Sequence, residues 1–476
     1  MRGVCHFWRI TMFKRAALCV ALFAPLSVLA ATDASSGNNE DLRTIREEIK
    51  QLKESYEQRI QQLEQRLQQA ETNSRNAENT AAQAVATAQQ ADHPSATSEG
   101  SFNPAISLIL QGTYGQLQQD PAIPTTGFSI SPPNNTGYTK GFSLGESEIS
   151  IAANIDPQFR GIGTFSLQPT GGISVENGFV QTSALGNGLN LKFGRFFSGL
   201  GYLNEQHSHT WDFVDQPLVY RVLWDNQLAD DGVQLKWLAP TDMFVEIGGE
   251  LGRGLGFPGT DKNQNGSGAE ALFAHIGDDV GIENSWRAGV SFHETKRENA
   301  VSNAANSLGI PTNNLSNIFN GDTHTSGLDF IWKYSPNGNI RERYLKVQGE
   351  YFRRTESGQL TYGNAGPTDS YDVTQSGWYL QSVYQFMPTW RTGLRYDRLD
   401  PGNPSIGGSI ALNANNIINN YAFNPSRITW MTDYNPSEFT RLRLQLAHDN
   451  SRQGLPDNQL FLQYIMSMGA HGAHQY

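Results

Sequence analysis

The chain has 476 residues, a formal net charge of −11 and a mean hydropathy of −0.47. Its two cysteines, Cys5 and Cys19, both lie near the N-terminus, so a chain that has lost an N-terminal export signal has neither a disulfide framework nor thiol chemistry. The acidic balance argues against a nucleic-acid partner.

Residues 1–30 have the organisation of a secretory signal peptide. Lys14 and Arg15 precede an apolar run that ends in small residues at Ala30. The run is too short to cross a bilayer as a helix, which takes about 20 residues, so a membrane anchor is the weaker alternative. Removing the segment takes away four cations and no acids, which changes the formal charge from −11 to −15.

Residues 31–40 are a polar spacer, and residues 41–93 follow with heptad spacing. Glu, Gln, Lys and Arg fill the positions between the apolar ones, as on the outer face of a coiled coil. A solvated single helix remains an alternative to the coiled coil, and so does disorder beyond residue 72, where the seam is mostly Ala. Residues 94–101 form a linker that starts at Pro94. The apolar seam begins with Leu42, Ile45, Ile49, Leu52 and Tyr56.

From residue 102 to residue 476 the period of the apolar residues is two. Leu442 and Leu444, for example, alternate with Arg441 and Arg443. The segments are about ten residues long and often begin or end with Trp or Tyr, which is typical of strands that cross an outer membrane. A soluble β-sandwich also alternates, but nothing in it requires aromatic strand ends.

Two kinds of connection alternate along this region. Short turns contain Pro, Gly, Asn or Asp, and we count seven of them; the others are long and polar, such as 296–325, 355–375 and 400–426. Outer-membrane barrels have this asymmetry between periplasmic turns and external loops. The sequence therefore predicts an all-β transmembrane barrel of about 16 antiparallel strands, preceded by an α-helical coiled coil, with both ends of the barrel in the periplasm.

Residues 194–232 form a connection much longer than the usual hairpin loop of about 2–5 residues. The segment is rich in aromatic residues, including Trp211, Phe213 and Trp224, which do not suit a solvated linker. On the predicted strand count it is the third external loop. We expect it to be structured and to fold back into the barrel.

This loop carries a family resemblance. Its Gly194-Arg195-Phe196 start and the run from Gly199 to Tyr202 resemble a stretch of the phosphate-selective porin O/P-like family. The resemblance implies a bacterial outer-membrane porin, assembled as a homotrimer, whose third loop narrows the channel. The predicted coiled coil resembles the periplasmic extension of sucrose-type porins. That family has basic residues in this loop, whereas this chain has mostly acidic ones.

The acidic loop residues and the arginines of the late strands are the candidate pore constriction. Carboxylates that face lumen arginines across a narrow aqueous zone would set ion selectivity. The alternative is that the arginines pair with carboxylates of adjacent strands and only line the wall. The candidate residues are Glu205, Asp212, Asp215, Arg221, Arg391, Arg395, Arg441 and Arg443.

The same loop contains a candidate metal site. His207 and His209 lie two residues apart, close in sequence to Glu205 and Asp212, and imidazole with carboxylate suits zinc or copper. Ordinary hydrogen-bonded histidines are the alternative. His471 and His474 near the C-terminus belong to the other end of the barrel.

The function expected from the sequence is passive diffusion of small hydrophilic solutes or ions through an outer-membrane channel, without a cofactor. The expected partners are the outer-membrane lipid bilayer, the solutes and two further copies of the chain. One alternative is a structural tether or adhesion protein whose coiled coil contacts the cell wall, and another is a metal-related uptake protein. An enzyme is not expected, because nothing marks Ser208, next to His207, as an activated nucleophile.

Overall fold

We describe the protein from a computed structural model, in which the chain divides into two compact units, Met1–Ser101 and Phe102–Tyr476. In the first unit the structure describes Glu47, Lys50 and Lys53, which are helical and exposed. The rest of the predicted signal peptide, spacer, coiled coil and linker lies outside the described residues, as do His471 and His474. In the second unit the described residues are 104–128, 139–168, 171–183, 185–260, 265–305, 311–362, 366–408 and 423–469.

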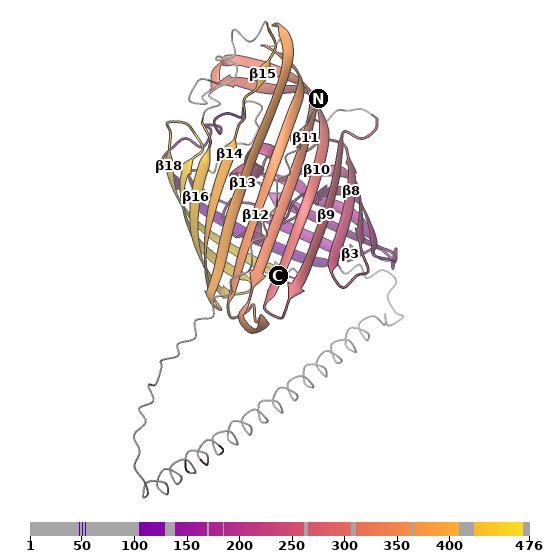
Figure 1. Ribbon diagram of the computed structural model, residues 1–476, viewed down its shortest axis with the longest axis vertical. Coiled ribbons are helices and arrows are strands. Elements are labelled where there is room, and N and C mark those ends of the chain that lie inside the picture. The colour runs from indigo at the N-terminus through magenta and orange to yellow at the C-terminus, as the bar shows by residue number, and fades with distance from the viewer. Residues whose placement is uncertain are drawn as a thin grey trace, which may run out of the picture. The chain divides into compact units, whose positions relative to one another are not determined.

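A closed ring of antiparallel strands forms the second unit (Figure 1). Eighteen strands lie in its described residues, and two of them, β2 (Gly141–Ser143) and β15 (Ser405–Ile406), are short. The ring closes where β18 pairs with β1, and the predicted barrel of about sixteen strands is therefore confirmed. The wall strands are β1 (Ala105–Leu117), β3 (Ser147–Asn154), β4 (Phe159–Leu167), β5 (Ile173–Thr182), β6 (Leu189–Phe197), β7 (Ala229–Leu238), β8 (Phe244–Gly252), β9 (Ala269–Val280), β10 (Asn284–Ala305), β11 (Pro311–Tyr334), β12 (Tyr344–Thr361), β13 (Thr368–Met387), β14 (Trp390–Asp400), β16 (Ser426–Ser437), β17 (Thr440–Asn450) and β18 (Asp457–Gly469).

The connections differ in length at the two ends of the ring. One end of the ring carries the short connections, and the longest connections, 118–146, 198–228 and 401–425, lie at the opposite end. The predicted alternation of short and long connections is present only in part, because 168–172 and 451–456, at the end with the longest connections, are also short. Among the described residues, no helix has the length and apolar character needed to cross a membrane. The short connections are 155–158, 183–188, 239–243, 281–283, 335–343 with the 3-10 helix η2 (Pro336–Gly338), 388–389 and 438–439.

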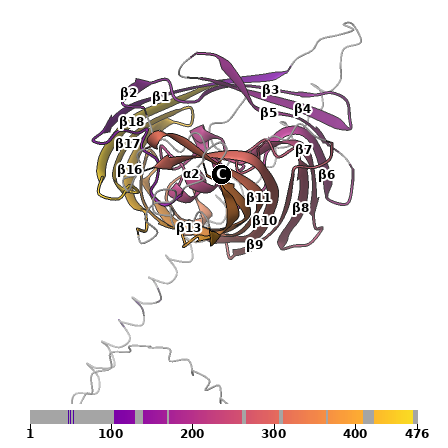
Figure 2. The same cartoon turned by 90° about the horizontal axis from the view of Figure 1, so that it is seen from above.

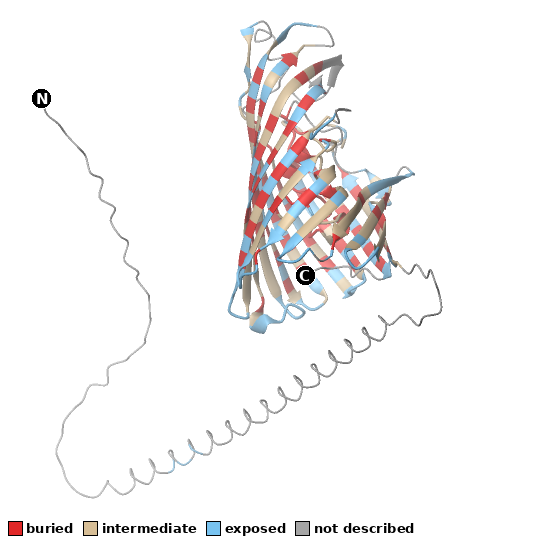
Figure 3. Cartoon of the chain, turned by 90° about the vertical axis from the view of Figure 1, so that its right-hand side faces the viewer, coloured by how far each residue is buried: buried red, intermediate tan, exposed pale blue. Residues whose placement is uncertain are grey.

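Side chains of the wall alternate between its two faces, as the period of a strand dictates (Figure 3). On β14, Arg391 and Arg395 are buried inside the ring, whereas Trp390, Leu394 and Tyr396 are exposed on its outer face. The neighbouring strands repeat this pattern. The interior is thus polar and the outer face apolar, the inverse of a soluble protein.

Aromatic rings of neighbouring strands contact one another in tilted pairs on the apolar outer face. The ring centroids of Trp390 and Tyr434 lie 4.8 Å apart, and those of Trp378 and Tyr396 lie 5.6 Å apart. Amphipathic rings at the borders of an apolar band are a property of barrels that cross a membrane. The wall has the surface of a transmembrane β-barrel.

Four strands, β10 to β13, extend beyond their neighbours at the end with the long connections (Figure 1). The prediction of loops at 296–325 and 355–375 was therefore wrong, because most of these segments pair as strands, for example Thr295 with Thr323 and Glu356 with Val373. Outside lipid the outward side chains of a sheet meet water and need not be apolar, so the apolar alternation fades while the backbone ladder continues. A small apolar cluster stabilises the extension: Ala300, Phe319, Leu360, Tyr371 and Val373.

Residues 198–228, here called loop 3, join β6 to β7, the fifth and sixth strands of the wall. The loop contains a 3-10 helix, η1 (Ser208–Thr210), and a short helix, α2 (Leu218–Trp224). Figure 2 shows α2 inside the ring of strands. Every side chain of α2 is buried, which is the property of a helix that is surrounded on all sides. Loop 3 therefore occupies part of the lumen.

Candidate functional site

A cavity of about 1420 Å³ lies between loop 3 and the end of the ring that carries the short connections. Its walls are the inner faces of β3 to β6, the connections that follow β9 and β11, loop 3 itself, and residues of β12, β14 and β17. Its charged lining residues are six basic ones and five acidic ones. They are Arg160, Lys192, Lys333, Lys346, Arg391 and Arg441, and Glu148, Glu205, Asp212, Asp279 and Glu283.

Asp212 of loop 3 is buried against the wall and is held by three strands. Arg391 of β14 donates from Nη1 to its Oδ1 at 3.0 Å, Gln381 of β13 donates to its Oδ2 at 3.1 Å, and Lys346 of β12 forms an ion pair with it. Burial alone would raise the pKa of Asp212, but Lys346 and Arg391 outweigh it and lower that pKa well below its usual value. The carboxylate is therefore ionised and fixed in place.

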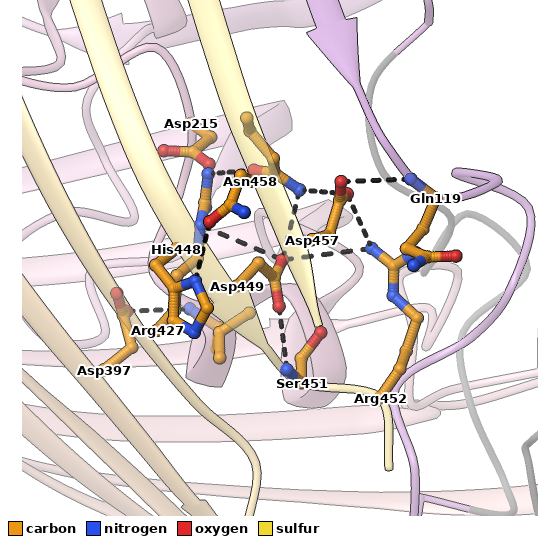
Figure 4. Close-up of polar contacts among 12 residues, drawn as sticks. Gln119, Asp215, Asp397, Arg427, His448, Asp449, Ser451, Arg452, Asp457 and Asn458 are labelled. Carbon is orange, nitrogen blue, oxygen red and sulfur yellow. Dashed lines mark hydrogen bonds and ion pairs between the residues drawn. The ribbon is translucent and has the colours of Figure 1, made fainter. Parts of the chain in front are cut away.

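Asp215, three residues further on, has two arginine partners. Arg395 of β14 donates to Oδ1 at 2.7 Å and to the backbone oxygen at 2.7 Å, while Arg427 of β16 forms an ion pair with Oδ2. Figure 4 shows Arg427 between Asp215 and Asp449 of β17. Burial opposes the charge of Asp215, but Arg427 and Arg395 outweigh it and lower its pKa well below the usual value.

The backbone of loop 3 is bound by the same wall. Arg443 of β17 donates to the backbone oxygen of Trp211 at 2.9 Å, and Arg441 donates to those of His209 and Trp211 at 3.2 and 3.3 Å. Gln445 accepts a hydrogen bond from the Val214 amide at 2.8 Å. These arginines bind the loop directly, so no open aqueous gap separates them from it.

Glu350 of β12 binds two further parts of loop 3 on this side, residues 202–203 and Tyr220 of α2. Its carboxylate accepts hydrogen bonds from the amides of Tyr202 and Leu203, each at 3.1 Å, and from the Tyr220 hydroxyl at 2.7 Å. Around these polar contacts the apolar face of α2 packs in one cluster with wall residues such as Phe352. Loop 3 is thus docked along the wall from β12 to β17 by both buried polar and apolar contacts.

On the opposite side, loop 3 has fewer contacts with the wall. Glu205 forms an ion pair with Lys236 of β7 at 2.8 Å. His207 Nδ1 lies 3.3 Å from Glu148 Oε2 on β3 and 3.3 Å from Glu176 Oε2 on β5. Burial opposes a charge on His207, but Glu148 and Glu176 outweigh it and raise its pKa to about 10. Without a bound cation the ring is therefore protonated at neutral pH.

The structure divides the predicted constriction residues into two groups. Glu205, Asp212, Arg391 and Arg441 line the cavity, together with His207. The second group is Asp215, Arg221, Arg395 and Arg443. In the described chain, this group and His209 do not belong to the lining of the cavity. Within the group, burial lowers the pKa of Arg221, while Asp449 and Asp215 act in the opposite direction.

Several residues that hold the loop were not among the candidates. Arg427 stands one residue before the apolar series of β16, and the alternation there places it inside the barrel. Lys346 and Glu350 alternate with apolar residues of β12 in the same way. The strand period therefore indicates that these side chains point into the barrel. It does not indicate which of the inward residues contact the loop.

No protein-family model matches the chain. Over 409 residues it is 29% identical to an uncharacterized protein of Aquifex aeolicus (strain VF5), with 80% of this chain and 82% of that protein covered. Its fold is similar to OmpT, an outer membrane protein of Vibrio cholerae (TM-score 0.46, 12% identity, 78% of this chain and 99% of that chain). It is also similar to an anion-selective porin from Comamonas acidovorans (TM-score 0.46, 12% identity, 77% and 99%) and to the outer membrane channel DcaP of Acinetobacter baumannii (TM-score 0.45, 12% identity, 77% and 97%).

Proposed function

We propose that the protein is an outer-membrane porin through which small hydrophilic solutes or ions diffuse passively. The observation that carries this proposal is a closed barrel with an apolar outer face whose polar lumen holds a folded loop above a cavity of about 1420 Å³. A barrel of this strand number is wide enough for an aqueous channel. Loop 3 then sets its minimum width.

The path that we propose lies on one side of loop 3. The loop is docked to the wall from β12 to β17, whereas much of the cavity is bounded by the inner faces of β3 to β6, with Lys346, Arg391 and Arg441 of the docking wall also in its lining. A solute would pass between Glu205 and His207 of the loop and wall residues such as Arg160 and Lys192. The narrow zone is therefore formed by part of the predicted constriction set, while the other part holds the loop in position.

The charges of this path favour neither sign strongly. Six basic and five acidic side chains line the cavity together with the protonated ring of His207, so the lining carries only a small excess of positive charge. Rings of charge of one sign are what gives channels strong ion selectivity. We therefore propose a weakly selective pore, in a homotrimer whose N-terminal coiled coil lies in the periplasm.

Planar-bilayer recording tests the proposal. The folded full chain, added to a lipid bilayer, should produce stepwise conductance and, across a salt gradient, a small reversal potential. A heat-unfolded sample of the same preparation is the control, since detergent and contaminants remain in it. Absence of conductance steps from protein that keeps the heat-resistant mobility of a folded barrel would contradict a porin.

A further inference from the structure

Three side chains from three separate elements meet where loop 3 approaches the β3–β5 wall. They are Glu148 of β3, Glu176 of β5 and His207 of loop 3, and one ligand atom from each lies within 4.8 Å of the other two. The Glu148 side chain is 1% exposed and that of Glu176 is 10% exposed. The group also borders the cavity, because Glu148 and His207 line it.

The facing atoms of these groups make no hydrogen bond within the part of the chain that the structure describes. They are Glu148 Oε2, Glu176 Oε2 and His207 Nδ1. The two contacts of 3.3 Å from Nδ1 are longer than the charge-assisted N–H···O bond of about 2.7–2.9 Å. Buried polar atoms that converge without bonding one another indicate room for another group between them.

A β-bulge places Glu176 in this group. Along the β4–β5 ladder, Thr164 pairs with Asn177 but Phe165 pairs with Val175, so Glu176 is an extra residue without a partner. In a regular strand Glu176 would face away from Asn177, toward the apolar outer surface. A bulge redirects a side chain in this way, and here the carboxylate points to His207 in the lumen.

The spacing of the three atoms suits a transition-metal ion. Zinc binds imidazole nitrogen and carboxylate oxygen at about 2.0–2.1 Å in a tetrahedron, which separates neighbouring ligands by about 3.4 Å. The two distances from His207 Nδ1 are both 3.3 Å. Three protein ligands leave the fourth position to water or a solute from the cavity, as in sites that are not purely structural.

The surroundings are those of ligands held by further contacts. His209 Nδ1 lies 3.3 Å from Glu148 Oε1, the oxygen that does not face the group. The Asn177 side-chain amide lies 3.0 Å from His207 Nε2, and its Oδ1 is buried without a hydrogen bond in the described chain. With this amide turned over, Oδ1 accepts a hydrogen bond from the Nε2–H of His207, and the lone pair of Nδ1 is then available for a metal.

We propose that Glu148, Glu176 and His207 bind a divalent transition-metal ion, with zinc as the ion that fits best, and that this ion ties loop 3 to the β3–β5 wall. The loop, already docked to the wall from β12 to β17, is then attached on both sides. The metal also stands at the edge of the proposed solute path. The proposed metal binding does not depend on the porin proposal. Only the conductance measurement below requires that the protein conduct.

Zinc binding to the full chain in detergent tests the site. After removal of metal with EDTA, titration with Zn²⁺ against a chromophoric chelator should give one ion per chain, and Co²⁺ should give the intense visible bands of a four-coordinate site. Glu176→Gln and His207→Asn should each weaken binding by more than the 10–100-fold typical of second-shell changes, and Asn177→Ala by about 10–100-fold. Zn²⁺ should lower the single-channel conductance of the wild type but not of Glu176→Gln.

His324→Asn is the matched control, because His324 forms an exposed pair with Glu294 at 3.5 Å in the strand extension. It should bind zinc as the wild type does. Binding that both site variants retain, or a wild-type cobalt spectrum of the weak octahedral kind, would overturn the proposal and leave a simple ion pair between His207 and the two carboxylates. The cobalt spectrum needs no variant, so it decides even if the variants do not fold. A protein that binds zinc but conducts no current would refute the porin and not the site.

Discussion

The two sides of loop 3 are built differently. Toward the wall from β12 to β17, buried carboxylates such as Asp215 meet arginines directly and α2 packs into an apolar cluster. Toward β3 to β6, the contacts centre on His207 and His209, which meet Glu148, and a cavity of about 1420 Å³ lies beside them. The same loop thus has a structural side that fixes its position and, in the porin that we propose, a functional side that faces the solute path. The acidic residues of loop 3, which look alike in the sequence, therefore differ in their roles.

Breaking the structural side should have the largest effect. Asp215→Asn removes the carboxylate that Arg395 and Arg427 share and leaves them only Asp397 and Asp449, and removing one partner of a buried ion pair costs about 3–5 kcal/mol. We expect the loop to undock, which would be measured as protease cleavage within residues 198–228 and as noisier, larger single-channel currents. Glu294→Gln is the control, because it removes a carboxylate from an exposed pair. A loop that stays resistant to protease would show that Asp215 is not an anchor.

Asp212 belongs to both sides, so its substitution should give a mixed and smaller effect. It binds Lys346 and Arg391 and also lines the cavity. Asp212→Asn should leave the loop docked through Asp215 while it uncovers positive charge, and the reversal potential should move toward anions. Salt should weaken the shift, because screening increases. If the reversal potential at low salt equals that of the wild type, Asp212 lies outside the ion path.

Single charge changes on the functional side should have the smallest effects on the reversal potential and on the docking of the loop. Glu205→Gln should move the reversal potential toward anions and Lys192→Gln toward cations, with protease resistance unchanged in both. A unit charge at about 4 Å acts with about 1 kcal/mol in a water-like medium, so the permeability ratio should change by no more than about fivefold. Shifts of the same sign from both variants would place the path elsewhere.

The wall of the barrel was predictable from the sequence because lipid enforces a period of two. Every outward position that meets lipid must be apolar, as Leu394 and Tyr396 are, and this made the strand count readable. Where β10 to β13 rise out of the lipid this requirement ends. Residues 296–325 therefore had the composition of a loop, although the backbones of 296–305 and 311–325 belong to paired strands.

The site was predictable only in part. Alternation put Arg391, Arg395, Arg441 and Arg443 on the inner face, but it does not tell which carboxylate each one meets. Loop contacts such as that of Glu350 with Tyr220 depend on how 31 residues, 198–228, fold in the lumen. The sequence could not predict that Glu176 belongs to the site, since a bulge turns its side chain to the face opposite the one that the strand period indicates. The metal prediction for His207 and His209 remains a proposal.

The docking of loop 3 also has a consequence for the order of folding. The groups that hold it follow it in the chain by 130 to 232 positions, from the bond of Tyr220 with Glu350 to that of Trp211 with Arg443. Contacts between such distant residues form slowly, because a long chain must close before they contribute. Until β14 and β16 are in place, Asp212 and Asp215 remain hydrated, since burying them without a partner would be costly. We therefore expect the lumen to fill only as the last strands arrive, and the barrel to pass through a wider, wetter stage before loop 3 settles.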